Sequence, residues 1–258
     1  MGRGFFRALL AGAVLAPTLL VGTMLASQVG YAGLWEPLEA LGRPAIRQAL
    51  ALSVGTATVS ALLALALGVP CAYALARHRF PGARAVDVLL DLPMVLSPVA
   101  VGVAWILFFR GPAGQWVEAH LLRFVFEVPG IVLAQFTVAI AVVIRVLKAA
   151  FQDVDVRYEQ VARFLGCTPW GAFRRVSLPL ARRGVTAAFV LGWARALGEF
   201  GATVTLAGAM PGKTETVPVA IYLRLASVDV SGAVALMLVL CATGLLALGA
   251  VHALGERR

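Results

Sequence analysis

The stretch Tyr158-Glu-Gln-Val-Ala-Arg-Phe-Leu-Gly166 and the following Val176-Ser-Leu-Pro179 decide how this chain folds. Both belong to a polar, basic and helix-forming insert that covers residues 148–183 of a largely apolar chain. Four apolar stretches precede the insert and two follow it. A hydrophilic segment enclosed in this way is typical of a loop between two membrane-spanning helices. The sequence therefore predicts an all-α integral membrane protein.

The composition supports the membrane class. Hydrophobic residues make up 60% of the 258 residues and charged residues 14%, whereas a soluble domain carries about 25% charged residues. A helix needs about 20 mostly apolar residues to cross the hydrocarbon core. Six stretches meet this requirement and predict six transmembrane helices: 8–27, 46–76, 86–109, 128–147, 184–207 and 232–254. We expect an N-terminal helix with an external loop over 1–45 and a membrane domain over 46–254.

The net charge of +9 indicates the orientation of these helices. Lys and Arg concentrate on the cytoplasmic side of membrane proteins. With six spans, 14 of the 22 Lys and Arg residues lie on the side of the insert and of both termini, and six lie opposite. We therefore expect both termini and the insert in the cytoplasm, and no nucleic-acid partner. Arg3 and Arg7 would also fit a signal peptide, but the length of the first apolar stretch favours an uncleaved helix.

Several other classes of protein are disfavoured. The three cysteines and three histidines are scattered without ligand spacing, so neither a metal site nor a disulfide framework is expected. A membrane enzyme is not indicated, because there is no His-Glu-x-x-His motif and no pair of intramembrane aspartates. An ion-coupled secondary transporter would carry acidic residues in several spans and an internal repeat. Only Glu199 lies deep in a predicted span, and no repeat is evident.

The insert is long enough for two short helices. Four residues recur at helical spacing and give the first helix an apolar face: Val154, Tyr158, Val161 and Leu165. Asp153 or Asp155 can cap its start, and Gly166 can end it in a left-handed conformation. Thr168-Pro169 predicts the start of the second helix. From the residues alone, the apolar face can pack on the protein's own bundle or dock into a groove on a partner.

The spacing of the insert resembles the "EAA" loop of ABC-importer permeases: Glu-Ala-Ala, three residues, Gly, nine residues, Ile-x-Leu-Pro. Aligned on Gly166, that pattern falls on Gln160-Val161-Ala162, Val176, Leu178 and Pro179, with Glu159 one position upstream. Gln160, Val161 and Val176 depart from the commonest residues. The resemblance implies a type I ABC importer permease fold without enzymatic activity or a cofactor of its own. It also implies docking on an ATPase that binds ATP and Mg, through these residues: Glu159, Gln160, Val161, Ala162, Leu165, Gly166, Leu178 and Pro179.

The predicted fifth helix carries Arg195 and Glu199 near the middle of the membrane. Ionisable residues there are costly and commonly mark a transport path, but at i and i+4 these two can also pair with each other. An uncompensated arginine would favour an oxyanion, whereas a closed pair would not. In the predicted third helix, Pro93 and Pro98 can kink the backbone, and the aspartates at its cytoplasmic end could meet arginines of the insert.

A second resemblance covers most of the chain from about residue 46. The segments Arg195-Ala-Leu-Gly-Glu-Phe-Gly-Ala-Thr-Val-Thr-Leu-Ala-Gly208, Pro211-Gly-Lys-Thr-Glu-Thr-Val-Pro-Val-Ala-Ile-Tyr222 and Leu92-Pro-Met-Val-Leu-Ser-Pro98 resemble the permeases of molybdate ABC importers. A second proline often stands at Ser97 in that family. Sulfate and thiosulfate permeases are the nearest alternative, and no residue separates molybdate from tungstate.

This resemblance implies how the subunit works. It implies a homodimer in the bacterial inner membrane, two ABC ATPase subunits at the cytoplasmic face and a periplasmic molybdate-binding protein outside. The implied pathway or gate residues are Ser97, Pro98, Arg195, Glu199, Gly201 and Thr203. The implied external loop residues are Gly212, Lys213 and Thr214, where the lysine could attract a dianion.

One motif is misleading. Ala207-Gly-Ala-Met-Pro-Gly-Lys-Thr214 satisfies a relaxed P-loop pattern with alanine in the first position. A working P-loop follows a strand and opens a helix. This segment follows a predicted membrane helix and faces outside by the charge distribution, so we do not expect it to bind a nucleotide.

Overall fold

The computed structural model describes residues 3–33 and 35–256, and over these ranges it is helical without any strand. The elements are α1 (Arg3–Ala32), α2 (Glu36–Gly42), α3 (Pro44–Arg77), α4 (Ala83–Val95), α5 (Pro98–Arg110), α6 (Pro112–His120), α7 (Val128–Asp153), α8 (Val156–Phe164), α9 (Pro169–Ala172), the π-helix η1 (Phe173–Ser177), α10 (Leu178–Leu180), α11 (Arg182–Leu197), α12 (Gly201–Ala207), α13 (Val217–Ala226) and α14 (Val230–Glu256). The all-α fold class is therefore confirmed.

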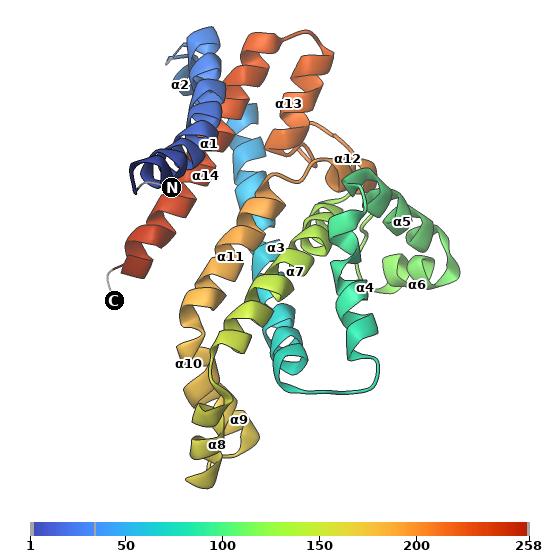
Figure 1. The fold of residues 1–258 in the computed structure, drawn as a ribbon. Helices are drawn as coiled ribbons and strands as arrows, with labels where there is room; N and C mark the ends of the chain where they lie inside the picture. Colours follow the sequence, from blue (N-terminus) through green and yellow to red (C-terminus); the bar gives the residue numbers. More distant parts are fainter. Residues whose placement is uncertain (1–2, 34, 257–258) are drawn as a thin grey trace.

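The centre of the bundle consists of α3, α7 and α11, which pack along one another (Figure 1). Glycines allow their close approach. A Cβ atom on Gly192 of α11 would lie 2.4 Å from Val143 of α7, and one on Gly68 of α3 would lie 3.0 Å from the same valine. Small residues at such contacts let membrane helices gain packing energy. The predicted second span, residues 46–76, lies within one helix that continues through Pro70.

The predicted third span is not one continuous helix. It consists of α4 and α5, which meet at an angle of 111°. Ser97 caps α5 by accepting a hydrogen bond from the backbone N–H of Ala100 at 3.2 Å, and Pro98 is the first residue of that helix. Proline cannot donate the hydrogen bond that would continue α4. The chain therefore stops one helix and starts another where apolar length alone predicts a straight span.

The predicted fifth span is also divided. Helix α11 ends at Leu197 and α12 begins at Gly201. Glu199 lies in the break, where its carboxylate accepts the N–H of Ala202 at 2.9 Å. The two breaks meet in space, because a Cβ atom on Gly201 would lie 2.9 Å from the Cβ of Pro98. Two discontinuous helices thus pack against each other at their breaks.

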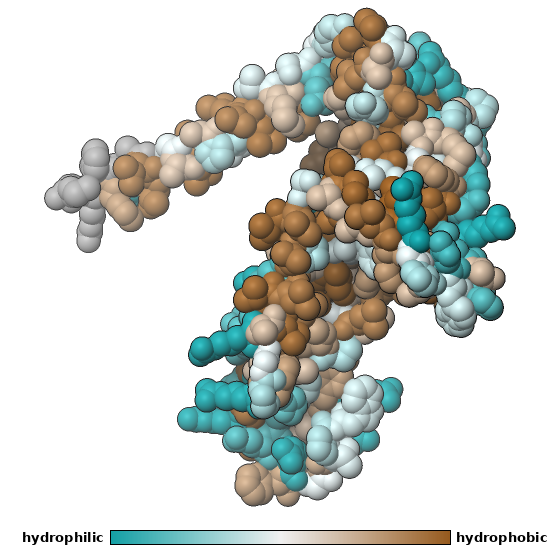
Figure 2. Space-filling model, turned by 90° about the vertical axis from the view of Figure 1, so that its right-hand side faces the viewer, coloured by the Kyte–Doolittle hydropathy of each residue, from teal (hydrophilic) through white to brown (hydrophobic). Residues whose placement is uncertain are grey.

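Four of the described helices are long and apolar enough to cross a membrane, and the bent pair α4–α5 can supply a fifth crossing. The count of six and the division at residue 45 stay predictions. Helix α4 is fixed to α7 by ion pairs of Asp87 with Lys148 and of Asp91 with Arg145. We expected both aspartates to pair with arginines of the insert. Instead, Asp87 pairs with a lysine of the insert, and Asp91 pairs with an arginine in the membrane-spanning part of α7. Helix α1 contacts α14 and extends from the bundle as a largely apolar arm (Figure 2).

Candidate functional site

The hydrophilic insert folds into short helices at one end of the bundle (Figure 1). Asp155 caps α8, because its carboxylate accepts the N–H of Arg157 at 2.9 Å. Gly166 follows α8 with a φ of +92°, a conformation that L side chains rarely adopt. Thr168 caps α9 by accepting the N–H of Gly171 at 3.1 Å. The structure confirms the predicted end of the first helix at Gly166 and the predicted start of the second helix at Thr168-Pro169. The first helix is capped by Asp155 and not by Asp153.

The return from α9 to the membrane runs through a π-helix. η1 covers Phe173–Ser177 and continues into α10, and α11 begins at Arg182. Leu178 and Pro179 form the start of the three-residue α10. Single π turns inside helices frequently occur at functional sites.

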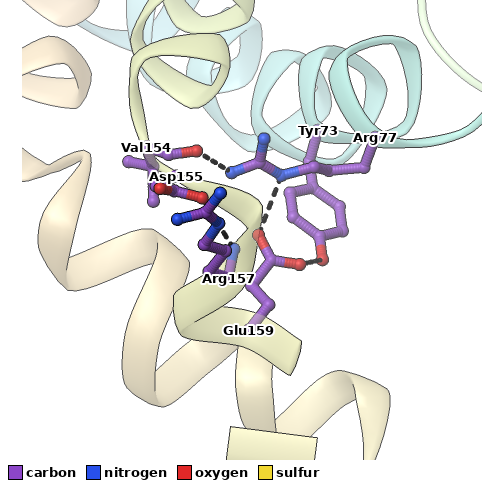
Figure 3. Close-up of polar contacts among 6 residues, drawn as sticks. All are labelled: Tyr73, Arg77, Val154, Asp155, Arg157 and Glu159. Carbon is purple, nitrogen blue, oxygen red and sulfur yellow. Dashed lines mark hydrogen bonds and ion pairs between the residues drawn. The ribbon is translucent and has the colours of Figure 1, made fainter. Parts of the chain in front are cut away.

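Glu159 connects α8 to the end of α3 (Figure 3). One carboxylate oxygen accepts a hydrogen bond from Arg77 Nε at 2.8 Å, and the other accepts one from the Tyr73 hydroxyl at 2.8 Å. Arg77 also donates to the carbonyl oxygen of Val154 at 2.6 Å. The side chains of Arg77 and Glu159 are only 7% and 11% exposed. We name Tyr73, Arg77 and Glu159 the α3–α8 clamp.

The clamp favours the ionised form of Glu159. Burial alone would raise the pKa of this carboxyl group, but the Ser177 hydroxyl, Tyr73 and Arg77 outweigh burial and hold the pKa below its ordinary value. The Ser177 hydroxyl is buried and faces this carboxylate, although it makes no hydrogen bond of standard geometry with the described residues. The carboxylate is therefore charged and held in place at neutral pH.

The opposite face of α8 is apolar and exposed. Phe164 is 91% exposed and Leu165 is 81% exposed, and three more apolar or aromatic side chains lie exposed nearby: Tyr158, Val161 and Trp170. Val154 does not belong to this surface, contrary to its periodicity, because it is buried in the same core cluster as Phe151. Figure 2 shows hydrophobic and hydrophilic residues mixed at this lower end of the molecule.

The residues predicted to couple to an ATPase fall into two groups. Glu159 faces the bundle, whereas the others range from half-buried to exposed: Gln160, Val161, Ala162, Leu165, Gly166, Leu178 and Pro179. A cavity of about 460 Å³ lies beside the clamp, between α8, α9 and the end of α3, and Arg163, His78 and Trp170 are among its lining residues. Tyr73 and Arg77 were not predicted as site residues, because their only signal in the sequence is their position in the last turns of a long helix.

In the membrane region, Arg195 and Glu199 pair with each other. Arg195 Nη1 lies 2.7 Å from Glu199 Oε2, and the glutamate side chain is 1% exposed. Of the two alternatives left open by the sequence, the structure has the closed pair, so the arginine is compensated. Gly201 packs against Pro98 beside this pair. Thr203 is buried, and its hydroxyl has no hydrogen-bond partner among the described residues.

The loop between α12 and α13, which the sequence predicts to be external, is held by contacts within the chain. Gly212 has a φ of +75°, and its carbonyl oxygen accepts a hydrogen bond from Gln48 at 2.9 Å. Lys213 pairs with Glu127, which compensates the charge that we expected to attract a dianion. Thr214 is buried and accepts the N–H of Met210 at 3.1 Å. The P-loop-like pattern follows a helix instead of a strand, so its structural context is not that of a P-loop.

A helical membrane bundle with a capped hydrophilic loop, discontinuous helices and an exposed apolar face on that loop has the architecture of a permease subunit. Residues 64–258 match the family of binding-protein-dependent transport system inner membrane components, and the chain belongs to this family. Permease subunits of such transporters are not enzymes themselves.

Two relatives illustrate the range of the family. The molybdenum transport system permease protein ModB of Mycobacterium tuberculosis (strain H37Rv) is 39% identical over 236 residues, which cover 90% of this chain and 88% of that protein. The sulfate transport system permease protein CysW of Escherichia coli (strain K12) is 35% identical over 193 residues, 74% of this chain and 66% of that protein.

A solved structure shares the fold. It is a bacterial alginate ABC transporter in complex with an alginate pentasaccharide-bound periplasmic protein. The superposition has a TM-score of 0.76 at 18% sequence identity and covers 99% of this chain and 96% of that chain. At this identity the similarity establishes the architecture alone.

Proposed function

We propose that this chain is the membrane-spanning permease subunit of an ATP-driven importer that moves molybdate into the cytoplasm. The observation that carries the proposal is the exposed apolar face of α8, presented on a helix whose two ends are capped and whose glutamate is fixed to the bundle. An apolar helix face of this kind fits a groove on a partner. The similarity to ModB proteins over most of the chain supports molybdate as the substrate.

The partners follow from this assignment. Two copies of the chain form the membrane pathway, and each copy docks α8 on one ATPase subunit, which binds and hydrolyses ATP with Mg. The similar alginate transporter is described in complex with a periplasmic protein, which supports a periplasmic molybdate-binding protein as the third partner. The charge distribution supports cytoplasmic termini and a cytoplasmic insert.

The pathway passes the contact between the two helix breaks. Ser97 and Pro98 on one side and Gly201 on the other bring the ends of α5 and α12 together. The Arg195–Glu199 pair lies in the second break. Since a closed ion pair offers no free positive charge, the state described here holds no site for an oxyanion at Arg195. Opening of the breaks is required before a dianion can pass.

The experiment that tests the function is transport into proteoliposomes that contain this chain and its ATPase, supplied with the binding protein and external molybdate. We expect uptake that requires ATP and the ATPase. Uptake that persists without the ATPase would contradict the assignment to an ABC importer. Leu165→Asp places a charge on the exposed apolar face of α8 and should abolish ATPase binding. Leu246→Ser, at a similarly exposed leucine of α14, is the control for the effect of a polar substitution on expression and assembly.

Sulfate is the second candidate substrate, because CysW of Escherichia coli is also similar to this chain. Molybdate and sulfate are both tetrahedral dianions, so competition separates them best. Molybdate uptake that resists an excess of sulfate supports the molybdate assignment. Uptake that sulfate blocks moves the assignment to the sulfate and thiosulfate branch.

A further inference from the structure

Few contacts attach α8 to the rest of the molecule. Helix α8 packs against α9 and η1, which belong to the same cytoplasmic insert. Among the described residues, the hydrogen bonds from α8 to a membrane helix come from Glu159, through Tyr73 and Arg77 of α3. A force applied to the exposed face of α8 therefore reaches the membrane through the covalent chain, through the packing of α8 on η1, whose Phe173 lies in the core of the bundle, and through the clamp.

Separating Arg77 from Glu159 is energetically unfavourable. Both charged side chains are almost fully buried, so separating them would leave an uncompensated charge in a poorly solvated place. Arg77 is fixed from a second direction by the carbonyl of Val154, the residue that ends α7. This carbonyl is among the last four of the helix, which lack an intrahelical donor. One guanidinium group thus joins the ends of α3 and α7 to α8.

Helix α3 reaches from the clamp to the opposite side of the membrane. It is continuous over 34 residues, and a helix of that length is about 50 Å long. At its other end, Gln48 donates a hydrogen bond to the carbonyl of Gly212 at 2.9 Å, and Ser53 accepts the N–H of Val217 at 2.8 Å. These two contacts hold the external loop at its middle, at Gly212, and at its end, where α13 begins. A single rigid element thus connects the cytoplasmic insert with the external loop.

We propose that Tyr73, Arg77 and Glu159 are positioning residues that make α8 and α3 move together, so that α3 carries the movement of the docked ATPase to the external loop around Gly212. This proposal rests on the proposed function and specifies which helix transmits the movement. The exposed apolar face of α8 provides the docking, and the clamp transmits the motion. We therefore expect that loss of the clamp uncouples ATP hydrolysis from transport and leaves the docking surface intact.

The test uses the complete complex in proteoliposomes and measures molybdate taken up per ATP hydrolysed. In Glu159→Gln the charge of the clamp is lost, and we expect this ratio to fall about tenfold or more because Arg77 loses its buried partner. ATPase binding, measured by co-purification, should persist. The exchanged pair Arg77→Glu with Glu159→Arg should recover part of the ratio. Asp153→Asn is the matched control, since it removes a charge from an exposed neighbouring carboxylate and should leave the ratio unchanged.

A second readout follows the external loop directly. In a variant whose three cysteines are replaced by alanine, Pro211→Cys supplies an exposed thiol in the loop, next to Gly212. We expect the rate at which a membrane-impermeant maleimide labels this thiol to change when ATP and Mg are added. This change should disappear with Glu159→Gln and persist with Asp153→Asn. A change that persists with Glu159→Gln would overturn the proposal.

The outcomes separate this proposal from the proposed function. If the parent complex shows no ATP-dependent uptake, the proposed function fails. If the parent transports and Glu159→Gln keeps its uptake per ATP, only the clamp proposal fails. If Glu159→Gln prevents assembly of the complex, Tyr73→Phe provides the test of the clamp. This substitution removes one hydrogen bond to Glu159 and no charge. An assembled Tyr73→Phe complex with unchanged uptake per ATP and unchanged labelling overturns the proposal, and a lowered ratio supports it.

Discussion

At the scale of single residues, Glu159 determines how the insert is held. The glutamate belongs to a motif that suggests contact with a partner, yet its carboxylate contacts Tyr73 and Arg77 of the same chain. A buried ion pair is weak evidence for stability, because desolvation offsets much of the attraction. Here the ion pair determines geometry: it fixes one face of α8 toward the bundle and leaves the other face exposed.

The pKa of Glu159 predicts how the insert responds to acid. Because the pKa is lowered in the folded state, the carboxylate stabilises the clamp fully above the ordinary glutamate pKa of about 4.3. This contribution is lost as the pH falls through the lower, folded-state pKa. Hydrogen exchange of the α8 amides, corrected for intrinsic exchange, should therefore speed up below about pH 4. Glu159→Gln should exchange faster at neutral pH and lack that step; an identical step in this variant would contradict the assignment.

Gly166 offers a test of backbone conformation alone. A Cβ atom there would meet no atom within 4 Å, so the φ of +92° is the whole obstacle to a side chain. Gly166→Ala should destabilise the turn by roughly 1–2 kcal/mol and weaken ATPase binding, measured by titration of the ATPase onto the reconstituted permease. Gly244→Ala in α14 is the matched control, since its Cβ atom also meets open space but its backbone φ is not positive. Equal binding by the two variants would exclude this explanation.

At the scale of elements, close packing of α11 on α7 depends on the absence of a side chain at Gly192. A Cβ atom there would lie 2.4 Å from Val143, and overpacking of a core typically costs about 1–3 kcal/mol. Gly192→Ala should therefore lower the midpoint of thermal unfolding of the purified protein. The double variant Gly192→Ala with Val143→Ala removes the clash and should recover part of the loss. Failure of the second substitution to help would show that the contact does not limit stability.

The discontinuous helices show where element-scale prediction from sequence fails. Apolar length indicates that residues 86–109 and 184–207 can cross a membrane, but it does not indicate continuity. The breaks depend on hydrogen bonds to particular groups, such as Ser97 accepting from Ala100 and Glu199 accepting from Ala202. Glu199 also has Arg195 as an ion-pair partner. A hydropathy profile averages over these polar residues and therefore predicts straight helices.

At the scale of the whole molecule, the sequence predicts the orientation of the chain in the membrane. Cysteine labelling can test this orientation. Ala113 in α6 and Asp153 at the end of α7 are both exposed and lie on opposite sides of the predicted membrane. In a cysteine-free background, Ala113→Cys should react with an impermeant maleimide added to intact cells with a permeabilised outer membrane. Asp153→Cys should react only after the inner membrane is opened. The reverse pattern would invert the topology and place the insert out of reach of an ATPase.

The sequence by itself determined the helical membrane class, the length of the long spans and the local geometry of the insert. The helical spacing in the insert, a cap at Asp153 or Asp155 and the left-handed residue Gly166 depend on neighbours a few positions away, so the sequence predicts them; the structure selects Asp155 as the cap. The tertiary structure decided what Glu159 contacts, that Arg195 is paired and that the two broken helices meet. The partner Tyr73 lies 86 positions from Glu159, and only the packing of α3 beside α8 brings the two together.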